Sequence, residues 1–154
     1  MKNGDYYIDR WLNDKAQGFG RQYYPNKILK YKGIFGNNEL NDYGIYIWKN
    51  GESYEGFFRN SMVTGVGKYY YIKGDLYEGD IFNNIKQGQG KYICSNENYF
   101  IDQRRNDMLN SYEEYYENDK LVYKGNFING IKNAYGKYYE FGVLKYKGNC
   151  FDGK

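Results

Sequence analysis

Residues 54–69 of this chain read YEGFFRNSMVTGVGKY, and this stretch decides the fold. Aromatic and aliphatic residues alternate with glycine or charged residues on both sides of a short polar segment that begins at Asn60. Alternation with a period of two is typical of strands that bury one face, and the polar segment predicts a hairpin turn. A second turn around Gly74 returns the chain to Tyr77. The stretch therefore predicts a repeat of two antiparallel strands and two turns.

The same pattern recurs along the chain with a spacing of 23 residues. A tripeptide with a leading tyrosine and a closing glycine begins at Tyr31, Tyr54, Tyr77, Tyr123 and Tyr146. The double step after Tyr77 predicts a degenerate repeat in between. We expect one repeat array over residues 1–154, with repeats that begin at Tyr7, Tyr31, Tyr54, Tyr77, Tyr99 (degenerate) and Tyr123, and a partial repeat at Tyr146.

Paired glycines follow the leading tyrosine in three repeats, as Gly65 and Gly67 follow Tyr54, whereas the repeats at Tyr31 and Tyr123 keep only Gly44 and Gly136. Glycines opposite large rings leave space for the rings to lie against the backbone, so both residue types are required together. Twelve or thirteen strands at about 4.8 Å each would extend over roughly 60 Å. We expect an all-β fold, a single-layer, elongated and twisted antiparallel sheet that forms a meander of tandem hairpins.

These residues resemble the MORN (membrane occupation and recognition nexus) repeat family. Its repeat runs Tyr-Glu-Gly, an aromatic residue two positions later, a polar turn, then Gly-x-Gly and alternating aromatics. The match is closest over residues 54–69 and covers nearly the whole chain, with a departure in the fifth repeat. The resemblance implies a groove that holds a target helix of a partner protein. It also implies dimers through terminal repeats in some members and a link to phosphoinositide membranes.

The residue types argue against catalysis. The chain has no histidine, the commonest general base and metal ligand, and its two cysteines, Cys94 and Cys150, lie far apart in the sequence. We interpret both as free thiols in a reducing compartment. The Gly-x-Gly pairs precede no helix and so do not predict a nucleotide loop. We expect no enzyme activity, no cofactor and no metal site.

The chain composition and its first residues indicate a cytoplasmic protein. A formal charge of +3 falls short of a nucleic-acid-binding signature. The residues after Met1 form no apolar signal segment, and no stretch approaches the ~20 apolar residues of a membrane-spanning helix. We expect a cytoplasmic location, peripheral to a membrane or cytoskeletal structure.

The aromatic residues are the best candidates for a functional surface. Tyr and Trp offer large rigid surfaces with a polar tip, and an amphipathic helix or extended peptide would suit a groove of such rings. The plainer interpretation is that the same rings form only the core. The candidate groove residues are Tyr31, Phe35, Tyr46, Trp48, Tyr54, Phe58, Tyr69, Tyr71, Tyr77, Tyr92, Tyr123, Phe127 and Tyr138.

A second candidate surface is a basic stripe on the face opposite the groove. Arg21, Lys68, Lys91 and Lys137 occupy one position of their repeats, with Ile45 and Glu113 interrupting the row. Such a stripe would attract anionic lipid head groups. The plainer interpretation is a solvated face that keeps the sheet soluble.

Three functions remain open at this stage. The first is a scaffold that binds a protein partner, the second is a peripheral binder of membrane phosphoinositides, and the third is an accessory domain of a larger enzyme. The final residues lie inside a repeat, which leaves open a longer chain or a last strand that pairs with a second copy. The degenerate fifth repeat predicts either a local bulge or a different contact with the partner.

Overall fold

The computed structural model describes residues 5–105, 108–109, 112–128 and 131–150. These residues form fourteen strands and no helix. The strands make one open antiparallel sheet in the order β1-β2-β3-β4-β5-β6-β7-β8-β9-β11-β12-β13-β14, with β10 paired to β9. The predicted meander of tandem hairpins is thereby confirmed.

The strands are β1 (Tyr6–Leu12), β2 (Lys15–Tyr23), β3 (Leu29–Gly36), β4 (Glu39–Ile47), β5 (Ser53–Arg59), β6 (Met62–Tyr70), β7 (Leu76–Phe82), β8 (Ile85–Ile93), β9 (Tyr99–Arg105), β10 (Met108–Leu109), β11 (Tyr112–Glu117), β12 (Lys120–Ile128), β13 (Ile131–Glu140) and β14 (Val143–Cys150).

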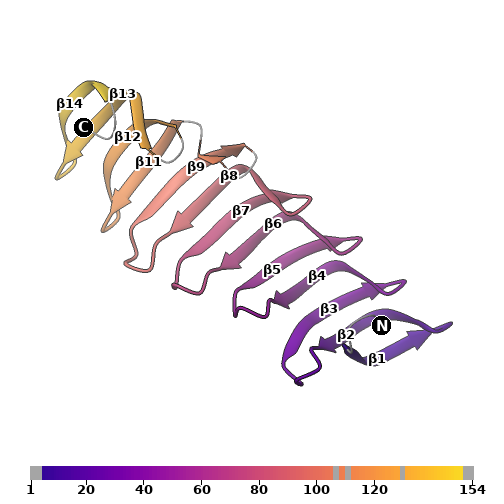
Figure 1. The fold of residues 1–154 in the computed structure, drawn as a ribbon. Coiled ribbons are helices and arrows are strands. Elements are labelled where there is room, and N and C mark those ends of the chain that lie inside the picture. Colours follow the sequence, from indigo (N-terminus) through magenta and orange to yellow (C-terminus); the bar gives the residue numbers. More distant parts are fainter. Residues whose placement is uncertain (1–4, 106–107, 110–111, 129–130, 151–154) are drawn as a thin grey trace. The chain divides into compact units, whose positions relative to one another are not determined.

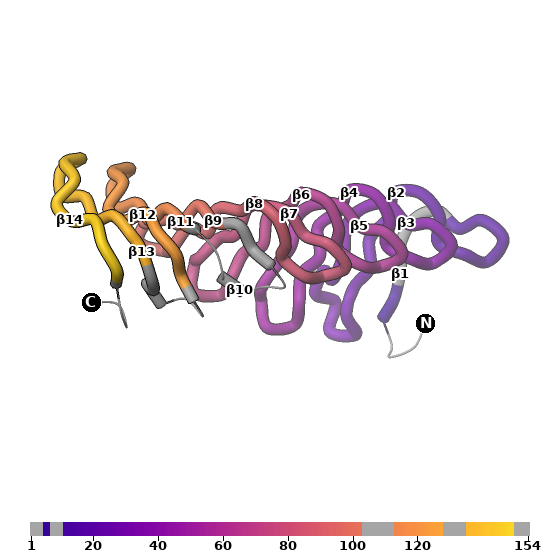
Figure 2. The backbone as a smooth tube through the Cα atoms, turned by 90° about the horizontal axis from the view of Figure 1, so that it is seen from above, coloured from indigo at the N-terminus to yellow at the C-terminus, as the bar shows by residue number. Residues whose placement is uncertain are grey.

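The chain divides into two compact units. The N-terminal unit comprises Met1–Ile72 and Ile81–Asn84, and the C-terminal unit comprises Lys73–Asp80 and Ile85–Lys154. In the N-terminal unit, strands β1 to β6 follow one another side by side (Figure 1). In the C-terminal unit, β11 to β14 do the same at the orange and yellow end of the chain (Figure 2). Each unit is therefore a stack of hairpins in chain order.

One glycine from most strands lies in a row that crosses the sheet, which we call the glycine row. In the N-terminal unit it contains Gly20, Gly33, Gly44, Gly56 and Gly67. In the C-terminal unit it contains Gly125, Gly136 and Gly148.

In four repeats the leading tyrosine lies against two glycines of this row; these tyrosines are Tyr31, Tyr54, Tyr77 and Tyr123. A Cβ atom placed on Gly44 or Gly67 would lie 2.6 Å from the phenol ring of Tyr31 or Tyr54, respectively. The Tyr31 hydroxyl then donates a hydrogen bond of 3.0 Å to the backbone carbonyl of Ile34. The predicted contact of rings with glycine backbone is confirmed, and it buries these tyrosines on a sheet that has no second layer.

In three repeats a second ring closes over the leading tyrosine. Phe35 meets Tyr31 edge-on with centroids 5.0 Å apart, and Phe58 of the next repeat meets the same tyrosine at 5.3 Å. In the C-terminal unit, Phe127 covers Tyr123 in the same way at 5.4 Å. Edge-to-face pairs of this kind add to the apolar burial. The core is thus a line of interlocked rings along one face, each shared by neighbouring repeats.

The first glycine of each Gly-x-Gly pair has a different role from the second. Gly65 has a φ of +75° and lies beside a register shift, where β6 carries extra residues opposite β5. A Cβ atom placed on Gly65 would lie no closer than 3.7 Å to the Phe57 side chain, an ordinary contact, so the expectation that both paired glycines make room for rings was wrong for this position. Asp42 takes the same place in the preceding repeat with a φ of +54°. Asp and Asn tolerate the left-handed region better than most residues, which explains the exchange.

The turns within repeats connect each hairpin to the one before it. The four described ones, residues 13–14, 37–38, 60–61 and 83–84, each consist of two residues with positive φ, as two-residue hairpin turns of the primed type require. The side chain of Asn38 accepts a hydrogen bond from the Ala16 amide at 2.8 Å, and its own amide donates to the Ala16 carbonyl at 3.1 Å. Ser61 binds Leu40, and Asn84 binds Val63, in the same two-bond arrangement. We call these contacts the turn ladder.

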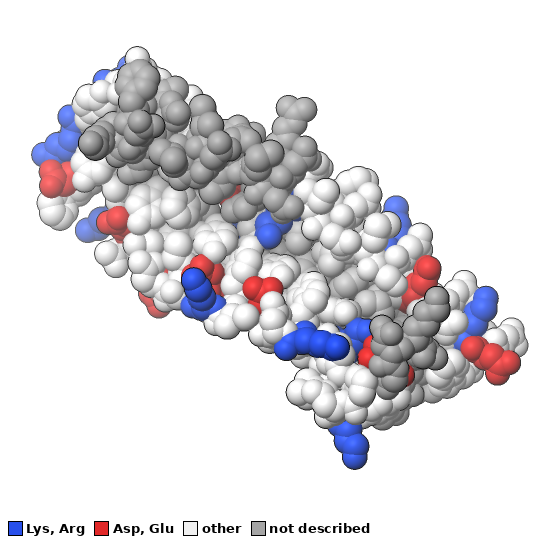
Figure 3. Space-filling model, viewed as in Figure 1, with Lys and Arg blue, Asp and Glu red and all other residues white. Residues whose placement is uncertain are grey.

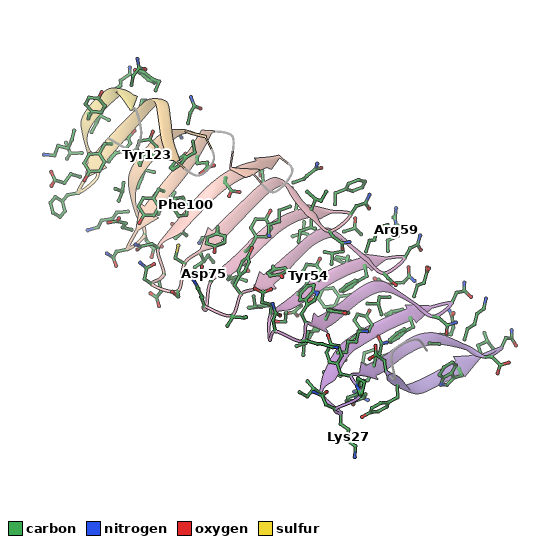
Figure 4. The ribbon with its side chains drawn as sticks, viewed as in Figure 1. Lys27, Tyr54, Arg59, Asp75, Phe100 and Tyr123 are labelled. Carbon is green, nitrogen blue, oxygen red and sulfur yellow. The ribbon has the colours of Figure 1, made fainter. Side chains whose placement is uncertain are left out.

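The fifth repeat begins one residue later than its sequence indicated. Phe100, not Tyr99, lies opposite both Tyr92 and Tyr115, the register that leading tyrosines occupy elsewhere. Tyr99 instead stacks on Tyr116 at 4.7 Å. Figure 4 labels Phe100 beside the leading tyrosine Tyr123 of the following repeat. The unit starts are therefore corrected at this one position, which restores an even spacing of 23 residues from Tyr77 to Tyr123.

This correction places two acidic residues in the glycine row. Asp102 pairs with Gly90 and Glu113 pairs with Gly125, so the two acids occupy the positions that glycines fill in other repeats. Both side chains are buried. Phe100 has no hydroxyl, and so this repeat also lacks the tyrosine hydrogen bond to backbone. Glu113, predicted to interrupt the basic stripe, is a buried residue of the opposite face, and Glu114 takes its place in the stripe.

Candidate functional site

Four half-buried aromatic side chains form a continuous row in the N-terminal unit. Tyr46 and Tyr69 come from strands β4 and β6, and Trp48 and Tyr71 follow directly after these strands. The ring centroids are 5.0 Å apart from Tyr46 to Trp48, 5.1 Å from Trp48 to Tyr69, and 4.7 Å from Tyr69 to Tyr71. We call this set the aromatic row. It leaves a strip of rigid apolar surface in contact with solvent.

A carboxylate orients Tyr69, the centre of the row. Its hydroxyl donates a 2.9 Å hydrogen bond to Glu52, and the Asn50 amide donates to the same carboxylate oxygen at 3.0 Å. Burial and the neighbouring carboxylate raise the pKa of the Tyr69 hydroxyl above its usual value. The phenol therefore stays neutral at physiological pH and keeps its ring in a fixed place.

A similar arrangement, in which a tyrosine hydroxyl and a second group donate to one carboxylate, recurs in the C-terminal unit. We call it the carboxylate clamp. Tyr92 donates a 2.6 Å hydrogen bond to Asp75, and the Ser95 amide donates to the other oxygen of that carboxylate at 2.9 Å. These two hydrogen bonds lower the pKa of Asp75 below its ordinary value, the Tyr92 bond having the larger effect. In Figure 4, Asp75 lies on the turn that leads into β7. In each unit, a hydrogen bond from a tyrosine hydroxyl to a carboxylate thus orients one accessible aromatic ring.

An apolar pocket of about 450 Å³ adjoins the aromatic row at Trp48. It lies between two successive turns that join repeats, residues 24–28 and 47–51. Tyr24 is buried at its base, and its hydroxyl donates a 2.8 Å hydrogen bond to the Ile47 carbonyl. The lining residues are Tyr24, Pro25, Asn26, Ile28, Ile47, Trp48, Lys49 and Gly51. We call this the turn pocket.

Comparison with known protein families matches the MORN repeat over residues 10–27, 31–53, 54–76, 77–99 and 123–139. These segments make up more than half of the chain. The chain belongs to the MORN-repeat family. No curated protein matches it in a direct comparison. The MORN match omits residues 100–122, the segment in which Phe100, Asp102 and Glu113 depart from the repeat. The protein is thus a repeat scaffold with one aberrant MORN unit.

The MORN core accounts for seven of the thirteen aromatic residues proposed for the groove. These seven are buried: Tyr31, Phe35, Tyr54, Phe58, Tyr77, Tyr123 and Phe127. Their rings lie against glycine backbone and against each other, and so offer little surface to another molecule. The accessible members are those of the aromatic row in the N-terminal unit, and Tyr92 and Tyr138 in the C-terminal unit.

Sequence reasoning missed the turn pocket. Apart from Trp48, a candidate groove residue, its lining residues had no predicted role, because they lie in or beside the turns that join MORN repeats, where the period of two is interrupted. The available signal was the apolar content of the first such turn, because Pro25 and Ile28 occupy positions where the next turn has the charged residues Lys49 and Glu52. An exposed isoleucine in a turn, 56% accessible at Ile28, is a marker of this kind of surface.

The basic stripe is mixed in sign in the described residues. Arg21 lies opposite Lys32, whereas Lys68 lies opposite Glu55. Lys91 lies over the ring of Tyr99, 3.7 Å from its centroid, and Lys137 lies between Lys124 and Lys147 on neighbouring strands. Lys124 in turn forms an ion pair with Glu114. On the face drawn in Figure 3, blue and red side chains are likewise scattered among neutral ones.

In the described part of the chain, few metal-binding or nucleophilic side chains lie close to one another. Over the residues that the structure describes, no three His, Cys, Asp or Glu side chains lie close enough to hold a metal ion. Burial raises the pKa of the Cys94 thiol, which disfavours the reactive thiolate. Within those same residues, no helix is long and apolar enough to span a bilayer. The site's chemistry is that of an aromatic contact surface.

Proposed function

We propose that this MORN array is a non-catalytic scaffold that binds a segment of a partner protein, helical or extended, on the aromatic row. The array acts in the cytoplasm, at a membrane-associated or cytoskeletal structure. One observation carries the proposal: four aromatic side chains from two repeats form an unbroken, half-exposed row, and one of them, Tyr69, is held by a hydrogen bond to Glu52. Exposed aromatic strips are rare on soluble proteins unless they bind something, and preordered rings lose little entropy on binding.

The test is capture of partners from a native extract by the wild-type chain beside a Trp48→Ala, Tyr71→Ala variant. The matched control is Tyr43→Ala, Phe57→Ala, which removes a ring pair of 48% and 46% exposure from the other face of the same unit. We expect proteins that bind wild type and the control but not the row variant. Identical capture by all three would contradict the proposal. Substitutions of Tyr54 or Phe58 are unsuitable, because both residues belong to the core.

A second candidate function is attraction to an anionic membrane surface. Lys124, Lys137 and Lys147 lie directly opposite one another on β12, β13 and β14. Three lysines in one row repel each other, and a phosphorylated head group would relieve that repulsion. Sedimentation with vesicles that contain phosphoinositide tests this function at physiological salt. Binding should fall when Lys137 and Lys147 become Gln. It should persist when two lysines of the N-terminal unit become Gln, Lys15 at the start of β2 and Lys27 on a turn between repeats.

The terminal strand β14 favours self-association as an additional property. Tyr146 occupies a leading-tyrosine position, yet 49% of its side chain is exposed, while its counterparts are buried. Its hydroxyl still bonds to the Asn149 carbonyl at 3.1 Å, so the repeat is locally complete. A second copy that pairs along β14 would cover the ring, because edge strands present unpaired backbone groups. Sedimentation equilibrium should give the mass of a dimer, and Leu144→Lys with Tyr146→Lys should return a monomer.

A further inference from the structure

The turn pocket differs from the aromatic row in having a defined depth and a defined charge. Its lining comes from two successive turns and includes the buried Tyr24 ring, Ile28 and Trp48. A volume of about 450 Å³ accommodates one or two large apolar side chains. The pocket is therefore suited to a single anchoring residue, whereas the row offers an extended strip.

The charge at the pocket is positive. Lys30 and Lys49 place their ammonium groups 5.5 and 5.6 Å from the centroid of the Tyr24 ring. Lys30 is neutralised by Asp5, whose carboxylate lies 2.5 Å away. Lys49 makes no ion pair within the described part of the chain, and no acidic residue lines the pocket. An apolar cavity with an available cation at its rim is complementary to an apolar group that has an anion beside it.

The Tyr24 ring strengthens this complementarity. Burial is the main cause that raises the pKa of the Tyr24 hydroxyl, to about 12, so the phenol contributes no negative charge to the pocket. Its face is occupied by the two lysines, which cation–π contacts hold in position. The exposed Lys49 ammonium group thus lies at the rim of the pocket, beside the Tyr24 ring.

We propose that the turn pocket receives an acidic peptide segment of a partner protein. One large apolar side chain enters the pocket between Ile28 and Trp48, and a carboxylate within about one turn or two residues of it pairs with Lys49. The rest of the segment continues over Trp48 onto the aromatic row, which is why a polypeptide suits the surface better than a small molecule. This inference rests on the proposed binding function and specifies the chemistry of the partner.

The experiment selects peptides from a random phage-displayed library on the whole 154-residue chain. Enriched sequences should combine a Leu, Ile, Phe or Trp with an Asp or Glu close to it. The consensus peptide, synthesised and labelled, is then titrated against wild type, Ile28→Asp and Lys49→Glu. Both variants should weaken binding by about tenfold or more, because one removes the apolar wall and the other reverses the charge. Exchange of the peptide's acidic residue for Lys should restore binding to Lys49→Glu.

The control is Lys73→Glu, which makes the same change of charge on the next turn between repeats, outside the pocket lining. It should bind the consensus peptide like wild type. Enriched peptides without acidic residues, or equal affinity for wild type and Lys49→Glu, would overturn the inference. Peptides that lose affinity with Tyr71→Ala but not with the pocket variants would overturn it while leaving the proposed scaffold function intact. If no peptide is enriched, the pocket proposal fails, and capture on the aromatic row decides the scaffold function separately.

Discussion

At the scale of single residues, the contact between the leading tyrosine and two glycines organises each MORN repeat. The ring occupies the space that side chains of the glycine row would need, and its hydroxyl binds a backbone carbonyl within its own strand. Figure 4 labels Tyr54, which illustrates the arrangement in the N-terminal unit. Burial raises the pKa of its hydroxyl to about 12, as expected for a phenol enclosed by backbone. Every such tyrosine depends on glycines from two strands.

The two glycines of one Gly-x-Gly pair should therefore respond differently to substitution. Gly67→Ala would bring a methyl group against the Tyr54 ring, and we expect a loss of about 3 kcal/mol in the free energy of unfolding. Gly65→Asp copies the residue found at position 42 and should cost about 1 kcal/mol, because only the backbone preference is lost. Denaturant unfolding of both variants measures the difference. Equal losses would show that rings do not set the requirement for glycine.

At the scale of elements, the turns stabilise the hairpins by contacts to neighbouring repeats. The turn ladder should make the second turn residue more important than the first. Asn38→Gly retains positive φ but loses the hydrogen bond that the Ala16 amide donates to the Asn38 side chain. We expect the free energy of unfolding to fall by about 1 kcal/mol. Asn37→Gly, one residue earlier, should change stability much less. Thermal unfolding compares the two, and a larger effect at Asn37 would contradict the ladder.

Asp75, in the turn before β7, should make the free energy of unfolding depend on pH in the acidic range. Asp75 has a folded-state pKa below its ordinary value of 3.8, because Tyr92 and Ser95 donate to its carboxylate. Its contribution to stability is therefore complete above the unfolded pKa and is lost as the pH falls through the folded pKa. We expect Asp75→Asn to reduce the free energy of unfolding by about 1 kcal/mol at pH 7.

The difference between wild type and Asp75→Asn should shrink as the pH falls below about 4, where the wild-type carboxylate takes up its proton. Denaturant titrations across this range measure it. Glu97→Gln, a change at an exposed turn carboxylate, serves as the control and should show a flat difference. A gap between Asp75→Asn and wild type that stays constant into strong acid would argue against the clamp.

At the scale of the whole molecule, the chain is an array in which the fifth repeat differs from the others. Its buried acids, Asp102 and Glu113, lie on neighbouring strands in the glycine row, one position beyond the paired residues Ile101 and Glu114. Buried charges of like sign on adjacent strands destabilise a sheet. The repeat is thus the expected weak point of the C-terminal unit.

The variant Asp102→Asn, Glu113→Gln keeps the size of both side chains and removes their charge. We expect the free energy of unfolding at pH 7 to rise by about 1 kcal/mol. Glu55→Gln, Glu78→Gln, on the other face, is the matched control and should leave stability nearly unchanged. Circular dichroism during thermal unfolding measures both. A lower midpoint for the first variant would mean that the buried acids form favourable contacts and do not weaken the repeat.

Sequence periodicity was sufficient to predict the sheet, the hairpins and the contact of rings with glycine, because a period of two and a 23-residue spacing are properties of the pattern itself. It failed at Phe100, because Tyr99 is the residue type expected at a repeat start and lies only one position away. It also could not divide the aromatic residues into buried and exposed sets. That division depends on which rings the next repeat covers, as Phe58 covers Tyr31 and leaves Trp48 accessible.

The tyrosine rings that lie flat on glycines also provide a spectroscopic marker. The α-protons of Gly33, Gly44, Gly56 and Gly67 lie against the faces of Tyr31 and Tyr54. Circulating π-electrons shield nuclei above an aromatic face, so one α-proton of each such glycine should resonate far upfield in a proton NMR spectrum. In the fifth repeat, Asp102 and Glu113 replace these glycines, so this repeat should give no upfield-shifted glycine signal. Each shifted signal then reports on the integrity of one repeat, so that the loosening of a single hairpin becomes visible while the rest of the array stays folded.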